Sequence, residues 1–128
     1  MVTATTQGVK ISIETIYQDH QSDWANAHFM FAYRISIENL TDYAVQLLSR
    51  KWLIFDSNGT LREVEGQGVV GEQPVIEPGE SYVYVSGCNL KTEIGSMRGY
   101  YIMQRVSDEK NFIVDIPEFE LIVPYKLN

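Results

Sequence analysis

Residues 28–39 read HFMFAYRISIEN, and large apolar side chains occupy every second position of this stretch. Successive side chains of a β-strand point to opposite faces, so this period predicts a strand with one face in a core and the other in water. Half-buried strands of this kind are typical of antiparallel sheets. The face assigned to the core carries Phe29, Phe31, Tyr33, Ile35 and Ile37, and the opposite face carries Arg34, Ser36 and Glu38.

Similar alternation recurs on both sides of this stretch, in segments rich in the β-favouring residues Tyr, Val, Ile and Phe. No comparably long segment has the spacing of an amphipathic helix. Turn residues between the segments predict an all-β fold, either an antiparallel sandwich or a barrel. We favour an antiparallel β-sandwich of seven to eight strands. The further strands are expected at about 9–14, 44–55, 61–65, 81–86, 97–106, 111–116 and 119–123, and residues 17–27 are expected to form a polar loop.

Two of these segments carry more specific predictions. The pair Asn58-Gly59 favours a two-residue type I′ turn, because both central positions of that turn need a positive φ. The 44–55 segment is apolar on both faces, which predicts a strand that is covered on both sides. One face would carry Val45, Leu47, Leu53 and Phe55, and the other would carry Leu48, Trp52 and Ile54.

The chain has 128 residues, 45% of them hydrophobic, and a formal charge of −7. This length predicts a single domain, residues 1–128, that buries a core without disulfides. No apolar stretch approaches the ~20 residues of a membrane-spanning helix, so we expect no membrane insertion. The excess of acidic residues argues against nucleic acid, because basic side chains supply most of the binding energy to phosphates. The single cysteine, Cys88, and an N-terminal stretch without a signal-peptide pattern predict a cytoplasmic protein.

Residues 66–71, GQGVVG, match the spacing G-x-G-x-x-G of pyrophosphate-binding loops. That chemistry needs a helix directly after the glycines, and Pro74 and Pro78 oppose one. Between Arg62 and Lys91 the chain has five glutamates and no Lys or Arg, so a phosphate would meet acidic surroundings. We therefore expect the glycines to permit unusual backbone angles or close chain approach, with a pyrophosphate site as the alternative. The glycines concerned are Gly66, Gly68 and Gly71.

Residues 68–103, GVVGEQPVIEPGESYVYVSGCNLKTEIGSMRGYYIM, resemble the bacterial ApaG family, as do residues 31–39, 45–52 and 112–119. The resemblance implies an immunoglobulin-like, fibronectin type III-like sandwich. Related domains occur in eukaryotic F-box proteins and in a polymerase-interacting protein, where they are associated with protein contacts. Bacterial members are linked genetically to cobalt and magnesium tolerance, and the family's glycine motif has been proposed as a pyrophosphate site.

Catalytic groups are scarce in this sequence. A Ser or Cys nucleophile needs a base within hydrogen-bonding reach, and the only imidazoles belong to His20 and His28. Ser86 and Ser96 do not lie in a G-x-S-x-G elbow, and Cys88 has no base near it in sequence. We therefore expect no catalytic residue and no enzyme activity.

One segment has the composition of a metal site. Asp19, His20, Asp23 and His28 place two imidazoles and two carboxylates within ten residues, a donor set suited to zinc, cobalt or nickel. Their spacing matches no established metal-binding pattern. We expect a solvated polar loop, with metal binding by His20 and His28 as the alternative, and no cofactor.

Surface recognition is the remaining kind of function. Aromatic residues on an outer face are common interface anchors, and the glycine-rich loop could offer an acidic edge to a basic partner. In that loop Val69, Val70, Val75 and Ile76 are expected to pack onto the sandwich. The candidate partner-binding residues are Glu72, Glu77, Tyr82, Tyr84, Tyr100 and Tyr101.

These observations favour a non-enzymatic module that binds an unidentified protein partner, and the resemblance to the ApaG family implies a connection with divalent-cation homeostasis. The alternative is a regulator that binds a phosphate-containing small molecule or a divalent metal. An enzyme acting on dinucleotides is a third hypothesis. Exposed sheet edges could also accept a strand from another chain, and the sequence leaves the oligomeric state open.

Overall fold

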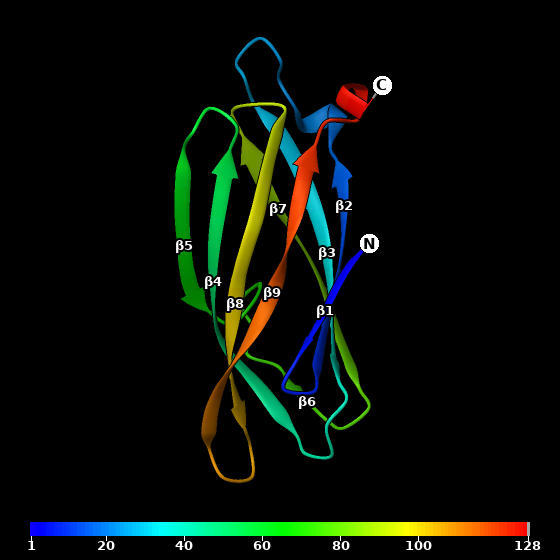
Figure 1. Ribbon diagram of the computed structural model, residues 1–128, viewed down its shortest axis with the longest axis vertical. Coiled ribbons are helices and arrows are strands. Elements are labelled where there is room, and N and C mark those ends of the chain that lie inside the picture. The colour runs from blue at the N-terminus through cyan, green and yellow to red at the C-terminus, as the bar shows by residue number, and fades with distance from the viewer. Residues whose placement is uncertain (128) are drawn as a thin grey trace.

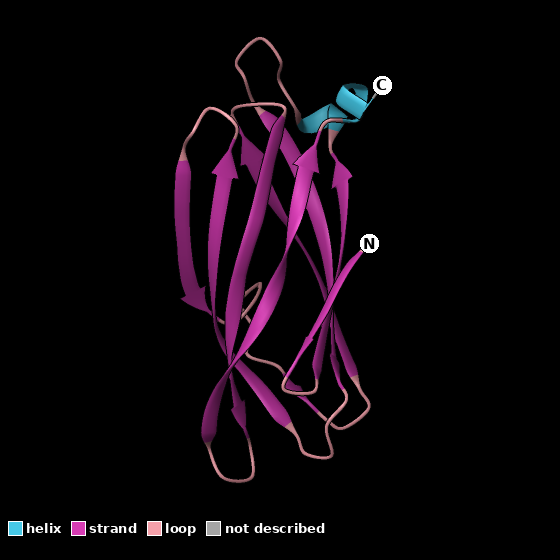
Figure 2. Cartoon of the chain, viewed as in Figure 1, coloured by secondary structure: helices cyan, strands magenta, loops and turns pink. Residues whose placement is uncertain are grey.

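A computed structural model describes residues 1–127 and contains nine β-strands with two short 3-10 helices (Figures 1 and 2). Within these residues no helix is long and apolar enough to cross a membrane. The strands are β1 (Val2–Thr6), β2 (Val9–Tyr17), β3 (Phe29–Asn39), β4 (Val45–Asp56), β5 (Leu61–Gln67), β6 (Val75–Ile76), β7 (Ser81–Leu90), β8 (Ile94–Arg105) and β9 (Lys110–Ile122); the 3-10 helices are η1 (Asp19–Gln21) and η2 (Pro124–Leu127).

The strands form two antiparallel sheets that pack face to face (Figure 1). One sheet has the order β1-β2-β3-β7, and the other has the order β5-β4-β8-β9 with β6 paired to β4. This architecture confirms the all-β, immunoglobulin-like antiparallel sandwich. The inward positions of β3 predicted from alternation are all buried. Among the largest fully buried side chains are Phe31, Ile35, Ile37, Leu47, Met103, Tyr101 and Leu121.

The strand number is nine, where seven to eight were predicted. The expected strands at 111–116 and 119–123 are one strand, β9, because a register shift between the pairs Met97–Phe119 and Gly99–Ile116 accommodates Pro117 without ending the strand. Sequence reasoning missed β1 and β6. The first consists mostly of threonine and small residues on an exposed edge, and the second has only two residues.

The face assignment of β4 was wrong beyond its first half. Val45 and Leu47 are buried as predicted, but a register shift between Leu47 and Ser49 reverses the alternation. An extra residue at a β-bulge changes which face every later side chain takes. Trp52 and Ile54 therefore enter the core, and Phe55 lies on the outer face with 44% of its surface exposed. The strand is not covered on both sides.

The β4–β5 turn also differs from its prediction. Gly59 has a φ of 93°, but Asn58 is not among the residues with positive φ. The Gly59 N–H donates to the Asp56 carbonyl at 2.9 Å, and the Asp56 N–H donates to the Thr60 carbonyl at 2.9 Å. Residues 57–59 therefore form a three-residue hairpin loop with Gly59 in the left-handed position. The Asn58 side chain accepts the Thr60 N–H at 3.0 Å.

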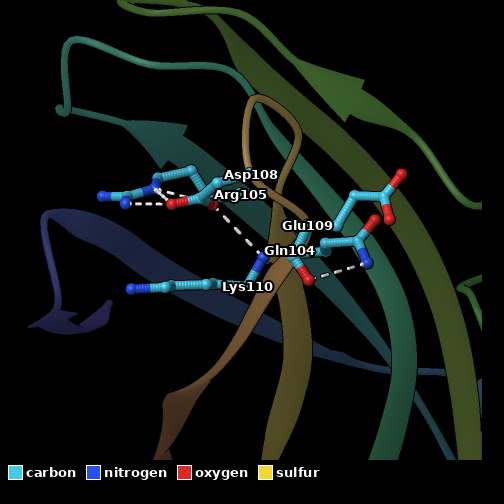
Figure 3. A network of polar contacts seen from close by, with 5 residues as sticks. All are labelled: Gln104, Arg105, Asp108, Glu109 and Lys110. Carbon is cyan, nitrogen blue, oxygen red and sulfur yellow. Dashed lines mark hydrogen bonds and ion pairs between the residues drawn. The ribbon is translucent and has the colours of Figure 1, made fainter.

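The β8–β9 hairpin is tied by a local polar network (Figure 3). Arg105 forms an ion pair with Asp108, and its guanidinium lies 5.0 Å from the centre of the Tyr43 ring. Asp108 also accepts the Lys110 N–H at 3.2 Å, and Gln104 donates to the Glu109 carbonyl at 3.3 Å. The hydrogen bonds from Arg105 lower the pKa of Asp108 to about 2.

An Arg105→Gln substitution is expected to raise the pKa of Asp108 toward its ordinary value of 3.8. Because the folded-state pKa is depressed, the carboxylate contributes stability above about pH 4, and that contribution is lost as the pH falls toward 2. A carboxyl-detected NMR titration measures the shift. Arg34→Gln, which removes the ion pair of Arg34 with Glu14, is the control and should leave Asp108 unchanged. An unmoved Asp108 titration in the Arg105 variant would contradict the assigned cause.

Candidate functional site

The glycine segment, residues 66–71, ends in a tight turn and not in a helix. Val70 and Gly71 have φ values of 48° and 78°. The flanking residues Val69 and Glu72 exchange backbone hydrogen bonds of 2.8 and 3.0 Å, so the pair forms a two-residue turn of type I′ character. The next element after this turn is β6, which begins at Val75. Val69 and Ile76 pack into the core as predicted, whereas Val70 and Val75 are exposed and contradict that prediction.

The other two glycines lie where chains approach closely. A Cβ at Gly68, whose φ is 61°, would lie 2.1 Å from the Glu72 carbonyl oxygen. A Cβ at Gly66 would lie 2.7 Å from Nη1 of Arg50. That guanidinium nitrogen donates to the carbonyls of Gly68 at 2.8 Å and Gln67 at 3.2 Å. Gly66 and Gly68 thus leave room for a contact that ties the loop to β4.

The same geometry bears on anion binding. The backbone N–H groups of Gly68, Val69 and Glu72 donate to the carbonyls of Leu48, Glu72 and Val69, so none of the three is free to bind a phosphate. The expectation of wholly acidic surroundings was wrong, however. Strand pairing places Arg50 opposite Gly66, although this cation lies outside residues 62–91 in the sequence.

A cleft of about 250 Å³, the inter-sheet cleft, opens between the edge strands β5 and β7. Arg62 reaches across it and donates to the Asn89 carbonyl at 2.5 Å, with a second contact of 3.7 Å to Sγ of Cys88. Burial raises the pKa of the Cys88 thiol, although the nearby Arg62 opposes that shift. The neutral thiol is a poor nucleophile.

The histidines lie at the opposite ends of the polar loop between β2 and β3. His20 is exposed on η1, and His28 exchanges backbone hydrogen bonds with Asp23 at 2.7 and 2.9 Å. The Asp23 carboxylate accepts the Ala25 N–H and the Asn26 side chain, and the second of these bonds lowers its pKa. Among residues 1–127, no group of three or more His, Cys, Asp or Glu side chains is placed to hold a metal ion.

The candidate tyrosines divide between the core and the surface. Tyr84 and Tyr101 are buried, their hydroxyls share a hydrogen bond of 2.5 Å, and burial raises the pKa of each. The prediction that these two residues are surface anchors was wrong, because the alternation of side chains along β7 and β8 directs both of them into the core. Tyr82 and Tyr100 are half-buried, the second opposite Lys51 on the outer face of its sheet. Glu72 and Glu77 are exposed.

A group of exposed and half-buried apolar side chains lies on the outer face of the β5-β4-β8-β9 sheet. It consists of Leu53, Phe55 and Leu61, which we call the outer-face patch. Phe55 and Leu61 are directly paired across β4 and β5, and Leu61 has 56% of its surface exposed. The three side chains line a shallow hollow of about 270 Å³ together with Ser96, Arg98 and Glu118.

Charged residues of both signs surround this patch. Leu53 lies between Glu63 on β5 and Arg98 on β8 in the strand register. One step further along the sheet, Lys51 pairs with Glu65 at 3.3 Å and with Glu63 at 3.9 Å. Hydrogen bonding and charge from these glutamates raise the pKa of Lys51. An apolar centre with a polar rim is the usual anatomy of a protein-binding surface.

Comparison with known proteins identifies the family. The family model for the ApaG domain matches residues 19–105. The chain belongs to the ApaG family. It is 45% identical to Protein ApaG of Brucella canis over 124 residues, which are 97% of this chain and 95% of that protein. It is 48% identical to Protein ApaG of Vibrio vulnificus over 120 residues, 94% of each chain.

A solved structure extends the likeness to three dimensions. The crystal structure of a Bordetella pertussis protein named ApaA has a TM-score of 0.87 to this chain at 40% sequence identity. The superposition covers 91% of this chain and 94% of the other. The sandwich described above is therefore also the fold of this relative, and the resemblance of the chain to the ApaG family is confirmed.

In this ApaG-family chain, sequence reasoning missed the outer-face patch altogether. Leu53 and Phe55 were placed on the same face as Val45 and Leu47, which are buried. The available signal was the polar run Ser49-Arg50-Lys51 between Leu48 and Trp52, which interrupts the alternation. Such an interruption in a strand pattern indicates a bulge, and residues beyond it should be assigned to faces independently.

Proposed function

We propose that this chain is a non-enzymatic protein-interaction module that acts in the cytoplasm. The main observation in support of this function is the outer-face patch. Phe55 and Leu61 are large apolar side chains that remain exposed on a rigid sheet, next to each other and above a shallow hollow. Clustered exposed apolar residues with a polar rim are typical of surfaces that another protein covers.

The side chains around the patch indicate which kinds of residue its partner places against it. A shallow hollow accepts an apolar side chain, and the adjacent Arg98 and Glu118 offer one charge of each sign. A partner with an apolar anchor flanked by both an acidic and a basic residue fits this arrangement. Phe55 is expected to supply most of the affinity, because aromatic anchors at the centre of an interface dominate its energetics.

The state of the potential nucleophile and bases supports a function without catalysis. The Cys88 thiol is buried with its pKa raised, and it contacts the Arg62 guanidinium and the Asn89 backbone carbonyl. A nucleophile of this type needs a nearby base that removes its proton, and a guanidinium does not serve as one. The two imidazoles that could act as bases, those of His20 and His28, lie on the loop between β2 and β3, whereas Cys88 lies on β7.

A small-ligand regulator of divalent-cation balance is the second candidate, and one observation favours it. Arg50 places a guanidinium at the glycine segment, where a phosphate-containing molecule would find a positive charge. Its Nη1 donates to two loop carbonyls, however, and three loop amides already have backbone acceptors. We therefore rank protein binding first.

The proposal is tested by quantitative affinity capture from a lysate of the cells that make the protein. A Phe55→Ser/Leu61→Ser variant is expected to recover at least about tenfold less of the wild-type chain's partner, because loss of a hot-spot anchor costs more than about 1.4 kcal/mol. Ile113→Ser is the matched control, since Ile113 is an exposed apolar residue on β9 of the same sheet. Denaturant unfolding verifies that all three proteins are folded. Equal recovery by the patch variant would contradict the proposal.

A further inference from the structure

Strand β7 is an edge strand of unusual composition. It lies at one end of the order β1-β2-β3-β7, and its sequence SYVYVSGCNL contains no charged residue and no proline. Natural edge strands generally carry charges, prolines or bulges that prevent pairing with another chain. The neighbouring edge β5 follows that rule with Arg62, Glu63 and Glu65. At the other side of the sandwich, the edge strand β1 contacts β9.

The backbone groups available on β7 can be identified from the ladder that it forms with β3. Asn39 donates its N–H to the Glu80 carbonyl at 3.0 Å. Peptide groups of an antiparallel strand face alternately toward and away from the partner, so those of Tyr82 and Tyr84 face β3. The odd-numbered residues face outward. Asn89 belongs to this outward series, as its carbonyl accepts Arg62 from across the inter-sheet cleft.

The open part of the edge has definite limits. At one end, Arg62 donates a hydrogen bond to the Asn89 carbonyl. At the other end, Glu80 belongs to a turn in which its N–H donates to the Glu77 carbonyl. The outward groups between these limits belong to Ser81, Val83, Val85 and Gly87. This run is symmetric about Tyr84. An antiparallel strand that pairs with residues 81–87 can therefore be a second copy of the same run, with Val83 of each copy opposite Val85 of the other.

We propose that a second copy of this chain pairs antiparallel with β7 about a two-fold axis at Tyr84, joining two four-stranded sheets into one of eight strands. This goes beyond the proposed function and uses a different surface from the outer-face patch. Val83 and Val85, 43% and 58% exposed, form cross-strand apolar pairs on the outer face of the joined sheet.

Charge favours a second copy as the occupant. The start of β7 is preceded by the exposed acids Glu77 and Glu80, and its end is followed by the exposed base Lys91. Antiparallel pairing places the acidic end of each copy near the basic end of the other, while the uncharged centre pairs with itself. The net charge of −7 on each chain opposes association, but at an ionic strength of about 0.15 M that repulsion is screened beyond about 8 Å.

Sedimentation equilibrium from about 10 µM to about 1 mM covers the weak association expected of a small interface. The wild-type chain should approach twice the mass of one chain. Val85→Lys should weaken dimerisation at least about tenfold, because charges on an edge oppose strand pairing. Val83→Lys is the second edge variant, and Val106→Lys, at an exposed valine in the β8–β9 turn, is the matched control that should dimerise normally. A wild-type chain that stays monomeric, or edge variants that dimerise like the control, would overturn the proposal.

Hydrogen exchange tests the register without any substitution. On raising the concentration, exchange should slow at the amides of Ser81, Val83, Val85 and Gly87, but not at those of Tyr82 and Tyr84. Protection of these four amides only when a different protein is present would assign the edge to that protein and overturn the second-copy proposal.

Charge reversal tests the antiparallel direction. Glu77→Lys and Lys91→Glu should each weaken the dimer, and an equimolar mixture of the two variants should recover it, since opposite charges then meet at both ends. If the mixture dimerises no more strongly than each variant alone, the antiparallel arrangement is contradicted. The outer-face variant Phe55→Ser/Leu61→Ser should dimerise normally. Failure of the dimer proposal can therefore be distinguished from failure of the proposed partner-binding function.

Discussion

Replacing Gly68 with alanine is expected to cost about 3–5 kcal/mol of unfolding free energy. Two effects combine at this position. The φ of 61° is unfavourable for a residue with a Cβ, and the added Cβ would lie 2.1 Å from the Glu72 carbonyl oxygen. The obstructing atom belongs to the backbone of the adjoining turn, so the clash is relieved only if that turn moves away from residue 68. Urea denaturation of both proteins measures the difference.

Gly71→Ala is the matched control for this experiment. Its φ of 78° is similarly unfavourable, but an added Cβ would meet no other atom within 4 Å. The expected cost is therefore about 1 kcal/mol, which is the conformational penalty alone. Equal costs at Gly68 and Gly71 would show that close chain approach does not explain the glycine segment.

Asn39→Ala is expected to destabilise the fold by about 3–5 kcal/mol, because the side chain is fully buried and makes several hydrogen bonds. Its Nδ2 donates to the carbonyls of Tyr43 at 2.8 Å and Ile76 at 2.9 Å. Its Oδ1 accepts the Thr41 N–H at 2.9 Å and the Thr41 hydroxyl at 2.6 Å. The residue joins the end of β3 to β6 of the opposite sheet, so its loss leaves the buried Ile76 carbonyl and the partly buried Tyr43 carbonyl without these donors.

Asn58→Ala provides the comparison. Asn58 is exposed in the β4–β5 turn, where its side chain accepts the Thr60 N–H at 3.0 Å. Loss of that bond should cost less than about 1 kcal/mol, because water can replace it. Denaturant midpoints of the two variants compare the loss of a buried set of hydrogen bonds with the loss of one exposed hydrogen bond. An Asn39 variant no less stable than the Asn58 variant would contradict the role assigned to Asn39.

Much of the fold follows from alternation alone. In β3, all five side chains assigned to the core by period two are buried. The pattern succeeds there because the strand pairs with β2 and β7 without a register shift, so the local period and the long-range packing agree. The ApaG family resemblance rested on several separate segments of the chain, and the matched relatives confirm it.

Prediction failed where strand pairing changes the local period. The bulge at Leu48 and the one at Pro117 each depend on how β8 pairs with its two neighbours, which the order of residues in one strand does not reveal. Because of the first bulge, Leu53 and Phe55 lie on the outer face of the sheet and not on the same face as Val45 and Leu47, so the sequence pattern did not predict the outer-face patch. Likewise, Arg50 contacts the glycine segment only because β4 and β5 pair.

The two proposed surfaces lie on different sheets and impose different requirements. The outer-face patch belongs to β4 and β5, whereas the open run of β7 lies at the edge of the other sheet. A dimer formed through β7 does not require the outer-face patch to be covered. Each copy can then bind a partner, and two linked copies would bind a partner with two sites more tightly than one copy does.

We propose that the glycine segment is architectural and that the protein works through its surfaces and not through a bound anion or metal. Isothermal titration calorimetry of the folded chain with pyrophosphate, and separately with cobalt chloride, tests it most directly. We expect no saturable heat up to about 1 mM of either ligand. Saturable micromolar binding of pyrophosphate that a folded Arg50→Gln variant loses, or of cobalt that a His20→Ala/His28→Ala variant loses, would contradict the claim.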